Sequence, residues 1–300
     1  MDRIFFYLFY LLSRLLSLLP FRVLYMVSDV TKYFVYYVFR YRRATVLVNL
    51  KNAFPTKSEQ ELKNIEWKFY QHFCDLFLEV NSALFASPRR AKKLVTFKNP
   101  DLINRYFDEG KSAIVAAGHY CNWEILSMVS LYTKHSVIAA YKPLKNKHFE
   151  SFINKSRERF GCIPVPMNDI ARMALKMACE GKPFFLGLFA DQTPKRNDIR
   201  YWTNFLNQDT PVFLGTEKIA RRTNQPVFFC NMYKVSRGHY EVEFELLVES
   251  PKDTKPYDIT ESHVRALEHL IQETPQYWLW SHRRWKHQRK RINQPLHDAV

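Results

Sequence analysis

Short, continuous apolar runs alternate along the chain with segments whose apolar residues recur at helical spacing. Apolar runs bounded by Gly or Pro are typical of strands that are covered on both faces. The clearest examples are residues 113–117 (AIVAA) and 183–190 (PFFLGLFA). Further strands are expected over residues 136–140, 162–166, 226–233 and 240–248. The last of these alternates apolar and polar positions, as an antiparallel edge strand does.

Helices are expected between these strands. Ser58 and Glu61 form a capping-box pattern that opens a long helix ending near residue 85. Shorter helices are expected over residues 101–109, 154–160, 169–180, 260–273 and within 211–222. Strands that alternate with helices indicate the α/β class. Residues 195–209 are interpreted as a polar and aromatic loop, a candidate lid or acceptor-binding segment.

The first 43 residues differ from the rest. Residues 4–20 are almost wholly apolar, residues 21–39 are apolar and aromatic, and a basic cluster at 40–43 closes them. The first run is marginally short for a bilayer span, which takes about 20 residues, and it lacks a small-x-small cleavage site. We expect residues 1–43 to form a membrane-associated helical segment, embedded or interfacial, followed by one domain over 44–291 and a tail over 292–300. An ordinary buried helix pair is the alternative.

Charge and composition limit the kinds of molecule that the protein is expected to bind. Lys and Arg number 45 against 29 Asp and Glu, a net charge of +16, and aromatic residues make up 16%. This mixture suits a membrane–water interface, where aromatic rings and cations meet headgroups. It also suits single-stranded nucleic acid, but a nucleic-acid-binding protein would not need the polar sets that follow two strands. The five widely spaced Cys residues contain no CxxC pair, which favours a reducing compartment over disulfides or zinc.

Both polar sets come directly after the clearest strands. Gly118-His119 follows residues 113–117, with Glu124 five positions after the histidine, and Asp191 follows residues 183–190. Within one helix, residues five apart point about 140° away from each other. We therefore expect His119 just outside a helix that begins near Asn122, with the turn bringing imidazole and carboxylate together beside free backbone N–H groups. A structural polar pair at a strand end is the alternative.

Two basic segments could contact an anionic substrate. Lys142 and Lys145 lie in a loop after residues 136–140, near the strand ends where α/β sites form. Residues 278–291 read WLWSHRRWKHQRKR, and Arg283 and Arg284 within them could grip a lipid phosphate while the tryptophans seat against headgroups. Alternatively the rings pack into the domain and the charges are solvated.

Five pieces carry a resemblance to a known family. They are Asn49-Leu50 with Phe54-Pro55, and residues 118–124 (GHYCNWE), 141–146 (YKPLKN), 191–194 (DQTP) and 278–286 (WLWSHRRWK). In this order they span nearly the whole chain. The sequence resembles the late acyltransferases of lipid A biosynthesis, the lauroyl/myristoyl-transferase type of the lysophospholipid acyltransferase superfamily. It departs from the family's usual residues at Lys142, commonly Arg, and at Cys121, commonly Gly.

The resemblance implies a membrane-bound α/β fold, similar to that of glycerol-phosphate acyltransferases, with a mixed central sheet flanked by helices. It implies acyl transfer from a thioester, on acyl carrier protein or coenzyme A, to a hydroxyl of a lipid A precursor or related glycolipid. Another membrane lipid (an ornithine lipid, a phosphoglycolipid or a lysophospholipid) is an alternative acceptor. A lipid hydrolase is the nearer rival enzyme, but it would need a nucleophile, and Cys121 is the candidate because no G-x-S-x-G occurs.

The resemblance also implies roles for residues. His119 and Glu124 match the family's catalytic pair, and Asp191 matches an acidic position near the active site. We expect His119 to be the general base and Glu124 to hold its tautomer, with Asp191 able to act in place of Glu124. The substrate-binding residues are expected to be Asn122, Trp123, Lys142, Lys145, Gln192, Arg283 and Arg284.

Cofactors and partners follow from the same resemblance. No metal or other cofactor is expected, since the acyl thioester is a co-substrate. The expected partners are acyl carrier protein, a membrane lipid acceptor and the inner-membrane surface, and no nucleic acid. The expected location is the bacterial inner membrane, with the catalytic face toward the cytoplasm.

Overall fold

A mixed seven-stranded sheet forms the centre of the molecule in the computed structural model, which describes residues 2–289. The strand order is β1-β9-β8-β2-β5-β3-β4. The strands are β1 (Val95–Phe97), β2 (Ala113–Ala117), β3 (Ser136–Tyr141), β4 (Ile163–Pro166), β5 (Phe184–Phe189), β8 (Val227–Ser236) and β9 (His239–Val248). All pairings are parallel except that between β8 and β9. The predicted α/β class and mixed sheet are confirmed.

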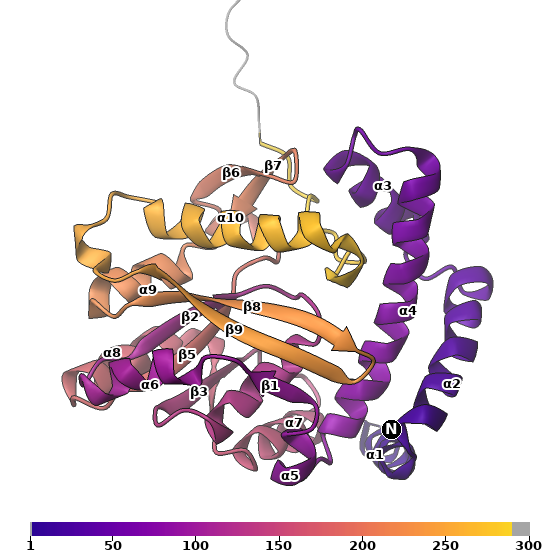
Figure 1. The fold of residues 1–300 in the computed structure, drawn as a ribbon, viewed down its shortest axis with the longest axis horizontal. Helices are drawn as coiled ribbons and strands as arrows, with labels where there is room; N and C mark the ends of the chain where they lie inside the picture. The colour runs from indigo at the N-terminus through magenta and orange to yellow at the C-terminus, as the bar shows by residue number, and fades with distance from the viewer. Residues whose placement is uncertain (1, 290–300) are drawn as a thin grey trace, which may run out of the picture.

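The central strand β2 is buried along its whole length and β5 over its first half, which explains their continuous apolar runs. Ile114 belongs to a buried cluster with side chains from α8 and α9, whereas its neighbour Val115 belongs to the larger cluster that includes side chains from α4 and α6. Helices thus flank both faces of the sheet (Figure 1). The helices of this part are α5 (Pro88–Ala91), α6 (Pro100–Asp108), α7 (Lys147–Glu158), α8 (Ile170–Cys179), α9 (Gly215–Thr223) and α10 (Asp258–Glu273).

Two local expectations were wrong, and one short strand was not foreseen. Residues 201–212 form a hairpin, β6 (Tyr201–Phe205) and β7 (Gln208–Val212), where a loop was predicted. Its two-residue turn, Leu206-Asn207, has both φ values positive, the geometry that suits the twist of a hairpin. Residues 123–131 form a 3₁₀ segment, η2 (Trp123–Leu131), instead of an α-helix. The three-residue strand β1 was too short to leave a periodic signal.

The N-terminal helices pack against one end of the sheet (Figure 1). They are α1 (Asp2–Leu18), α2 (Phe21–Tyr33), the π-helical turn η1 (Phe34–Val38), α3 (Arg43–Ala53) and α4 (Glu59–Ala83). The capping box of Ser58 and Glu61 is present at the start of α4, as predicted. The side chains that α2 turns inward are partly polar, so part of its apolar surface remains outside.

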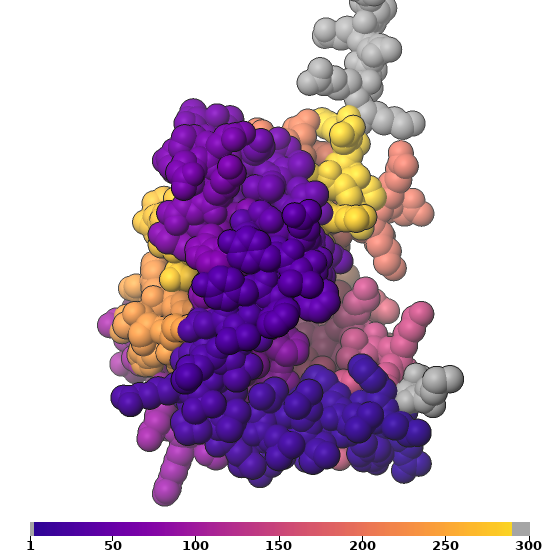
Figure 2. Space-filling model, turned by 90° about the vertical axis from the view of Figure 1, so that its right-hand side faces the viewer, coloured from indigo at the N-terminus to yellow at the C-terminus, as the bar shows by residue number. Residues whose placement is uncertain are grey.

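This end of the molecule has an exposed apolar surface, built from the N-terminal residues that cover the face seen in Figure 2. Met26 is 68% exposed and Phe39 is 72% exposed. Other exposed apolar side chains on α1, α2 and η1 are Ile4, Phe5, Leu8, Leu11, Leu12, Leu15, Leu18, Val30, Phe34 and Val38. Within residues 2–289, no helix has the length and apolar character needed to cross a bilayer, so a spanning N-terminal helix finds no support. The predicted tail, residues 292–300, lies outside the described residues.

Candidate active site

The register of the two central strands brings His119 and Asp191 together. Ala117 on β2 pairs with Phe189 on β5, and the strands are parallel. His119 and Asp191 each lie two residues beyond that pair, so both leave the same edge of the sheet side by side. The imidazole Nδ1 lies 2.6 Å from Asp191 Oδ1.

Asp191 is held by three donors. Besides the His119 ring, the backbone N–H of His119 and the indole Nε1–H of Trp278 each donate to Asp191 Oδ2 at 2.9 Å. The carboxylate is buried, so its position is fixed by these bonds and by the packing around it. Since an ionised Asp only accepts, the His119 Nδ1 carries a hydrogen and donates it. The other ring nitrogen, Nε2, is therefore left as a base.

His119 and Asp191 each shift the pKa of the other in the direction that favours its charged form. Burial by itself would lower the pKa of His119, but the charge and hydrogen bond of Asp191, with a smaller contribution from the charge of Glu124, hold that pKa above its ordinary value. Burial would raise the pKa of Asp191, but the charge and hydrogen bonds of His119 and the bond from Trp278 keep it well below its usual range. Asp191 is thus ionised at neutral pH and stabilises an imidazolium on His119.

The His119 ring is partly exposed, and its Nε2 has a side-chain neighbour. The His119 side chain is 17% exposed, and the Gln192 side-chain amide lies 3.0 Å from Nε2, where it donates to the free nitrogen. The rings of Trp123 and Phe189 lie 5.1 and 5.2 Å from the imidazole, centroid to centroid. Beside them is a small apolar pocket that Gly118 and Leu267 also line. A polar group that displaced the Gln192 amide would meet a base between apolar walls.

Glu124 does not occupy the position that the sequence suggested for it. It lies on η2, its side chain is 38% exposed, and its closest ionic partner is Arg157 Nη2 at 3.4 Å. No hydrogen bond joins it to His119 among the described contacts, so the expectation that Glu124 holds the tautomer is wrong in this structure. The reason is the sheet register, which places Asp191 at Nδ1 first. Glu124 acts on His119 through its charge.

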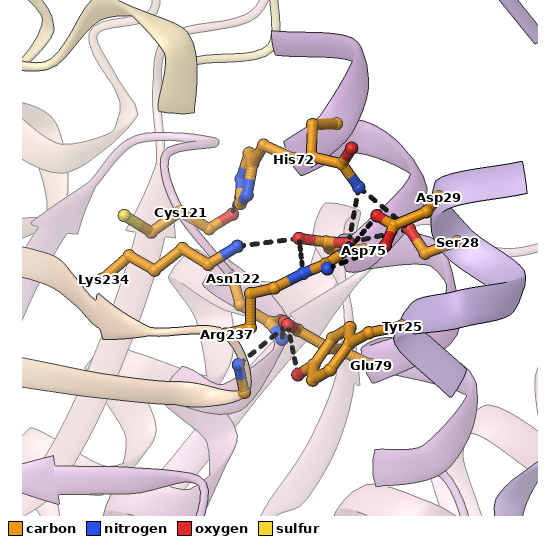
Figure 3. Close-up of polar contacts among 12 residues, drawn as sticks. Tyr25, Ser28, Asp29, His72, Asp75, Glu79, Cys121, Asn122, Lys234 and Arg237 are labelled. Carbon is orange, nitrogen blue, oxygen red and sulfur yellow. Dashed lines mark hydrogen bonds and ion pairs between the residues drawn. The ribbon is translucent and has the colours of Figure 1, made fainter. Parts of the chain in front are cut away.

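The loop after His119 is held in place by contacts with α4. Cys121 has a positive φ of 52°, and its carbonyl lies 3.2 Å from His72 Nε2 on α4. The Asn122 amide donates to Glu79, also on α4, at 3.1 Å, and Asn122 is buried. Asn122 therefore points into the protein, contrary to its expected role in substrate binding (Figure 3).

Glu79 belongs to a buried polar network that sequence reasoning missed. It also accepts from Tyr25 Oη on α2, from Tyr240 Oη and from the Gly238 N–H of the β8–β9 turn. One turn earlier, Asp75 pairs with Lys234 and Arg237 (Figure 3). Acidic residues four apart on a long helix were the only sequence signal. The network ties α2, α4 and the hairpin tip to the loop that follows His119.

Comparisons with known proteins identify the family of the chain. The family model for bacterial lipid A biosynthesis acyltransferases matches residues 1–287. The chain belongs to this family. A search of the curated proteins found no match. Solved structures that match include the 1-acyl-sn-glycerophosphate acyltransferase PlsC from Thermotoga maritima, at 13% identity and a TM-score of 0.38, over 86% of this chain and 99% of that one.

Several side chains of residues 278–286 of this acyltransferase lie inside the molecule. Trp278 and Trp280 are buried, and Trp278 and Tyr120 form an antiparallel bridge. Of the two arginines expected to grip a lipid phosphate, Arg283 is exposed, but Arg284 is only 1% exposed. The idea that these tryptophans sit against headgroups is wrong, because their rings fill the core beneath Asp191. The alternative of packed rings is correct, although it did not foresee a buried arginine.

The remaining expected binding residues lie at the same edge of the sheet. Lys142 and Lys145 are exposed in the loop that follows β3, and β3 lies next to β5. Trp123 and Gln192 contact the His119 ring. Arg157 on α7 was not foreseen, and the sequence carries no motif around it. Within residues 2–289, no group of His, Cys, Asp and Glu side chains is arranged to hold a metal ion.

Proposed function

We propose that this acyltransferase moves a fatty acyl chain from an acyl thioester to a hydroxyl of a lipid A precursor or related glycolipid, with His119 as general base and Asp191 as its orienting carboxylate. The observation that carries the proposal is the 2.6 Å bond between His119 Nδ1 and Asp191, which leaves Nε2 free to take a proton at an accessible face. General-base catalysis of this kind typically contributes ~10²–10⁴-fold to a rate.

The proposed reaction needs no protein nucleophile. The acceptor hydroxyl takes the place of the Gln192 amide and gives its proton to Nε2 as its oxygen attacks the thioester carbonyl. The tetrahedral intermediate then expels the thiolate, which takes the proton back from the imidazolium. Asp191 stabilises the imidazolium throughout, and the charge of Glu124 adds to this effect. Backbone N–H groups at the start of η2, or Lys142, would stabilise the oxyanion.

The rival hydrolase reading is disfavoured by the state of Cys121. Its thiol is fully buried and directed at the Met232 carbonyl oxygen, with Sγ and O 3.5 Å apart. Burial raises the pKa of this thiol far above its usual range, whereas a nucleophilic Cys needs a lowered pKa and access to substrate. A transferase whose acceptor supplies the nucleophile is the simpler proposal.

The exposed apolar side chains of α1, α2 and η1 suit a membrane-binding surface. We propose that this surface lies in the interface of the bacterial inner membrane, with the catalytic face toward the cytoplasm and the acceptor lipid in the same leaflet. An interfacial helix buries its apolar face at the headgroup boundary without spanning the bilayer. The net charge of +16 would steer an acidic acyl carrier protein toward the site. We propose no metal or other cofactor.

Lys142 stands where the family commonly has Arg, and this difference supports a second candidate acceptor. Lysine presents a point charge and cannot make the bidentate grip of arginine on a phosphate. Another membrane lipid, such as an ornithine lipid, a phosphoglycolipid or a lysophospholipid, is therefore the alternative acceptor. The site chemistry would be the same for each.

The deciding experiment is lipid mass spectrometry of a strain that lacks the gene, complemented by wild type, His119→Ala or His269→Ala. His269 is a matched control because it lies on the surface of α10 with its side chain 73% exposed. We expect one lipid class to lose a single acyl chain and to regain it with wild type and His269→Ala only. Restoration of that chain by His119→Ala would refute the mechanism, and a lost chain on a different lipid would identify the alternative acceptor.

A further inference from the structure

A second small cavity lies beside the His119–Asp191 pair, and Asp191 is part of its lining. Its volume available to the centre of a water molecule is about 10 Å³, which is room for about one water. Its polar lining comes from Asp191, His263 and Arg284, and its apolar lining from Ala117, Ala190, Phe205, Val212, Val264 and Leu267. Three polar side chains from separate parts of the chain thus converge on a space of molecular size.

Arg284 enters this cavity with unused hydrogen-bonding capacity. The side chain is 1% exposed, and its Nη2 donates to the Pro211 carbonyl oxygen at 2.7 Å. Its Nε and Nη1 groups are buried and have no hydrogen-bond partner among the described residues. His263 Nε2 is in the same situation. A buried donor or acceptor left unpaired costs about 1–3 kcal/mol, more when it is charged, so such groups normally bind water or an ion.

We propose that this cavity holds one ordered water molecule that links Arg284 to Asp191, and that Arg284 is thereby a positioning residue for the His119–Asp191 pair. A water offers two hydrogens and accepts two. It can accept from Arg284 and donate to Asp191 and to His263, whose pKa is lowered by burial to about 4, which keeps the ring neutral. All three groups that line the cavity would then be satisfied.

Water fits the space better than an anion does. Arg284 brings one positive charge, but the buried Asp191 carboxylate on the same cavity already brings one negative charge. A halide placed there would add an unbalanced negative charge in a poorly solvated place, which is costly. A neutral molecule with both donors and acceptors matches the lining without that cost.

The bridge has a consequence for proton binding. A buried positive charge close to the pair opposes protonation of its imidazole, so removing that charge makes the pair hold its proton more tightly. Glu124, whose partner is Arg157, acts on His119, and Asp191 acts on His263 and His282. Lys286 and Arg284 both act on His282. Of these, His282 is neutral near pH 7, since its pKa is lowered by burial to about 4, and the others are unchanged by a substitution at Arg284.

The first test concerns the water alone and does not depend on the proposed function. A crystal structure of the full chain at near-atomic resolution should contain a density peak in the cavity within hydrogen-bonding distance of Arg284 and Asp191. A companion crystal grown with bromide should give no anomalous signal there. An empty cavity, or a bromide peak, would overturn the proposal.

The second test measures the charge effect by NMR titration of His119 in Arg284→Gln, Arg284→Lys and the control Arg172→Gln. Arg172 matches in charge, but its side chain is 81% exposed on α8. We expect Arg284→Gln to raise the pKa of His119 by about 1 unit, and Arg284→Lys and Arg172→Gln to leave it near the wild-type value. An unshifted pKa in a folded Arg284→Gln would refute the coupling. If Arg284→Gln does not fold, Arg284→Lys decides, because loss of the water with an unchanged pKa would also refute it.

A third test measures the reaction rate of Arg284→Gln, and it depends on the proposed function. If His119 is the base, Arg284→Gln should be about tenfold slower than wild type at a pH below the pKa of His119 and should recover at high pH, because one pKa unit changes the neutral fraction tenfold. A merely structural defect would lower the rate equally at every pH. A pKa shift seen by NMR without a matching shift in the rate profile would count against His119 as the base, while leaving the water bridge intact.

Discussion

Asp191→Asn is the substitution that separates the two candidate carboxylates. The change keeps the size of the side chain and removes its charge. The Asn oxygen can still accept from the backbone N–H of His119 and from Trp278, both of which bind Oδ2. Its NH₂ group then faces Nδ1 of the ring. An amide that donates to Nδ1 forces the hydrogen onto Nε2, and that tautomer cannot act as a base toward the acceptor.

The expected fall in kcat has two sources, the loss of a charged hydrogen bond and the wrong tautomer of His119. A hydrogen bond to a charged group is typically worth ~1.5–3 kcal/mol, and the Asp191–His119 bond is short at 2.6 Å. Losing its stabilisation of the imidazolium would cost about 10- to 150-fold in rate at 1.4 kcal/mol per tenfold. The wrong tautomer adds to this. We therefore expect kcat to fall by about 10²–10⁴-fold, while the fold is retained.

The assay is acyl transfer from a labelled acyl thioester to the lipid identified by mass spectrometry, alongside ¹⁵N NMR of the His119 ring. Glu124→Gln is the matched control, because it removes a carboxylate of the same site that makes no bond to the ring. We expect Asp191→Asn to move the hydrogen from Nδ1 to Nε2 and Glu124→Gln to leave it on Nδ1. Near-normal turnover by a folded Asp191→Asn, or an unchanged tautomer, would show that Asp191 does not orient the base.

Other expectations follow from features at the same site and at the N-terminal surface. Wild-type kcat/KM should rise with pH through a midpoint above 6.5, since His119 must be neutral to act and its pKa is raised; a flat profile between pH 5 and 9 would contradict a titrating base. Gly118→Ala should destabilise the fold by about 1–3 kcal/mol in urea unfolding, because the added Cβ would overlap the Leu267 side chain; unchanged stability would mean that the helix carrying Leu267 yields. Met26→Asp should weaken binding to anionic vesicles in flotation without changing stability, whereas Val235→Asp, at a similarly exposed apolar position, should not; equal loss in both would argue against a seat on α2.

Much of the fold could be predicted because its signals are local. The apolar runs at β2 and β5 and the capping box at Ser58 depend on neighbouring residues only, and the structure has them. The hairpin β6–β7 escaped prediction because its strands mix polar and aromatic residues and its turn uses Leu206-Asn207 instead of Asn-Gly. The 3₁₀ segment η2 follows directly after Cys121 and Asn122, whose contacts with α4 no local pattern encodes.

The site was predicted in its residues more than in its contacts. Strand ends identified His119 and Asp191, but only the β2–β5 register decides that Asp191 reaches Nδ1 before Glu124 does. Asn122 and Arg284 were expected to bind substrate because they lie in the motifs 118–124 and 278–286 that carry the family resemblance. Both are buried, one on Glu79 and the other beside Asp191, and partners so distant in sequence leave no trace in a local motif.

The place of Trp278 in the chain has a bearing on biosynthesis. All seven strands of the sheet precede residue 249, but the indole that completes the donors of Asp191 comes about 30 positions later. Its segment is also fastened to the other end of the chain, where the Asn49 amide holds the carbonyl oxygens of Trp280 and His282. On the ribosome the sheet can thus emerge whole while the site is still unfinished. A product that ended before Trp278 would contain all seven strands but would lack one of the three donors that hold Asp191.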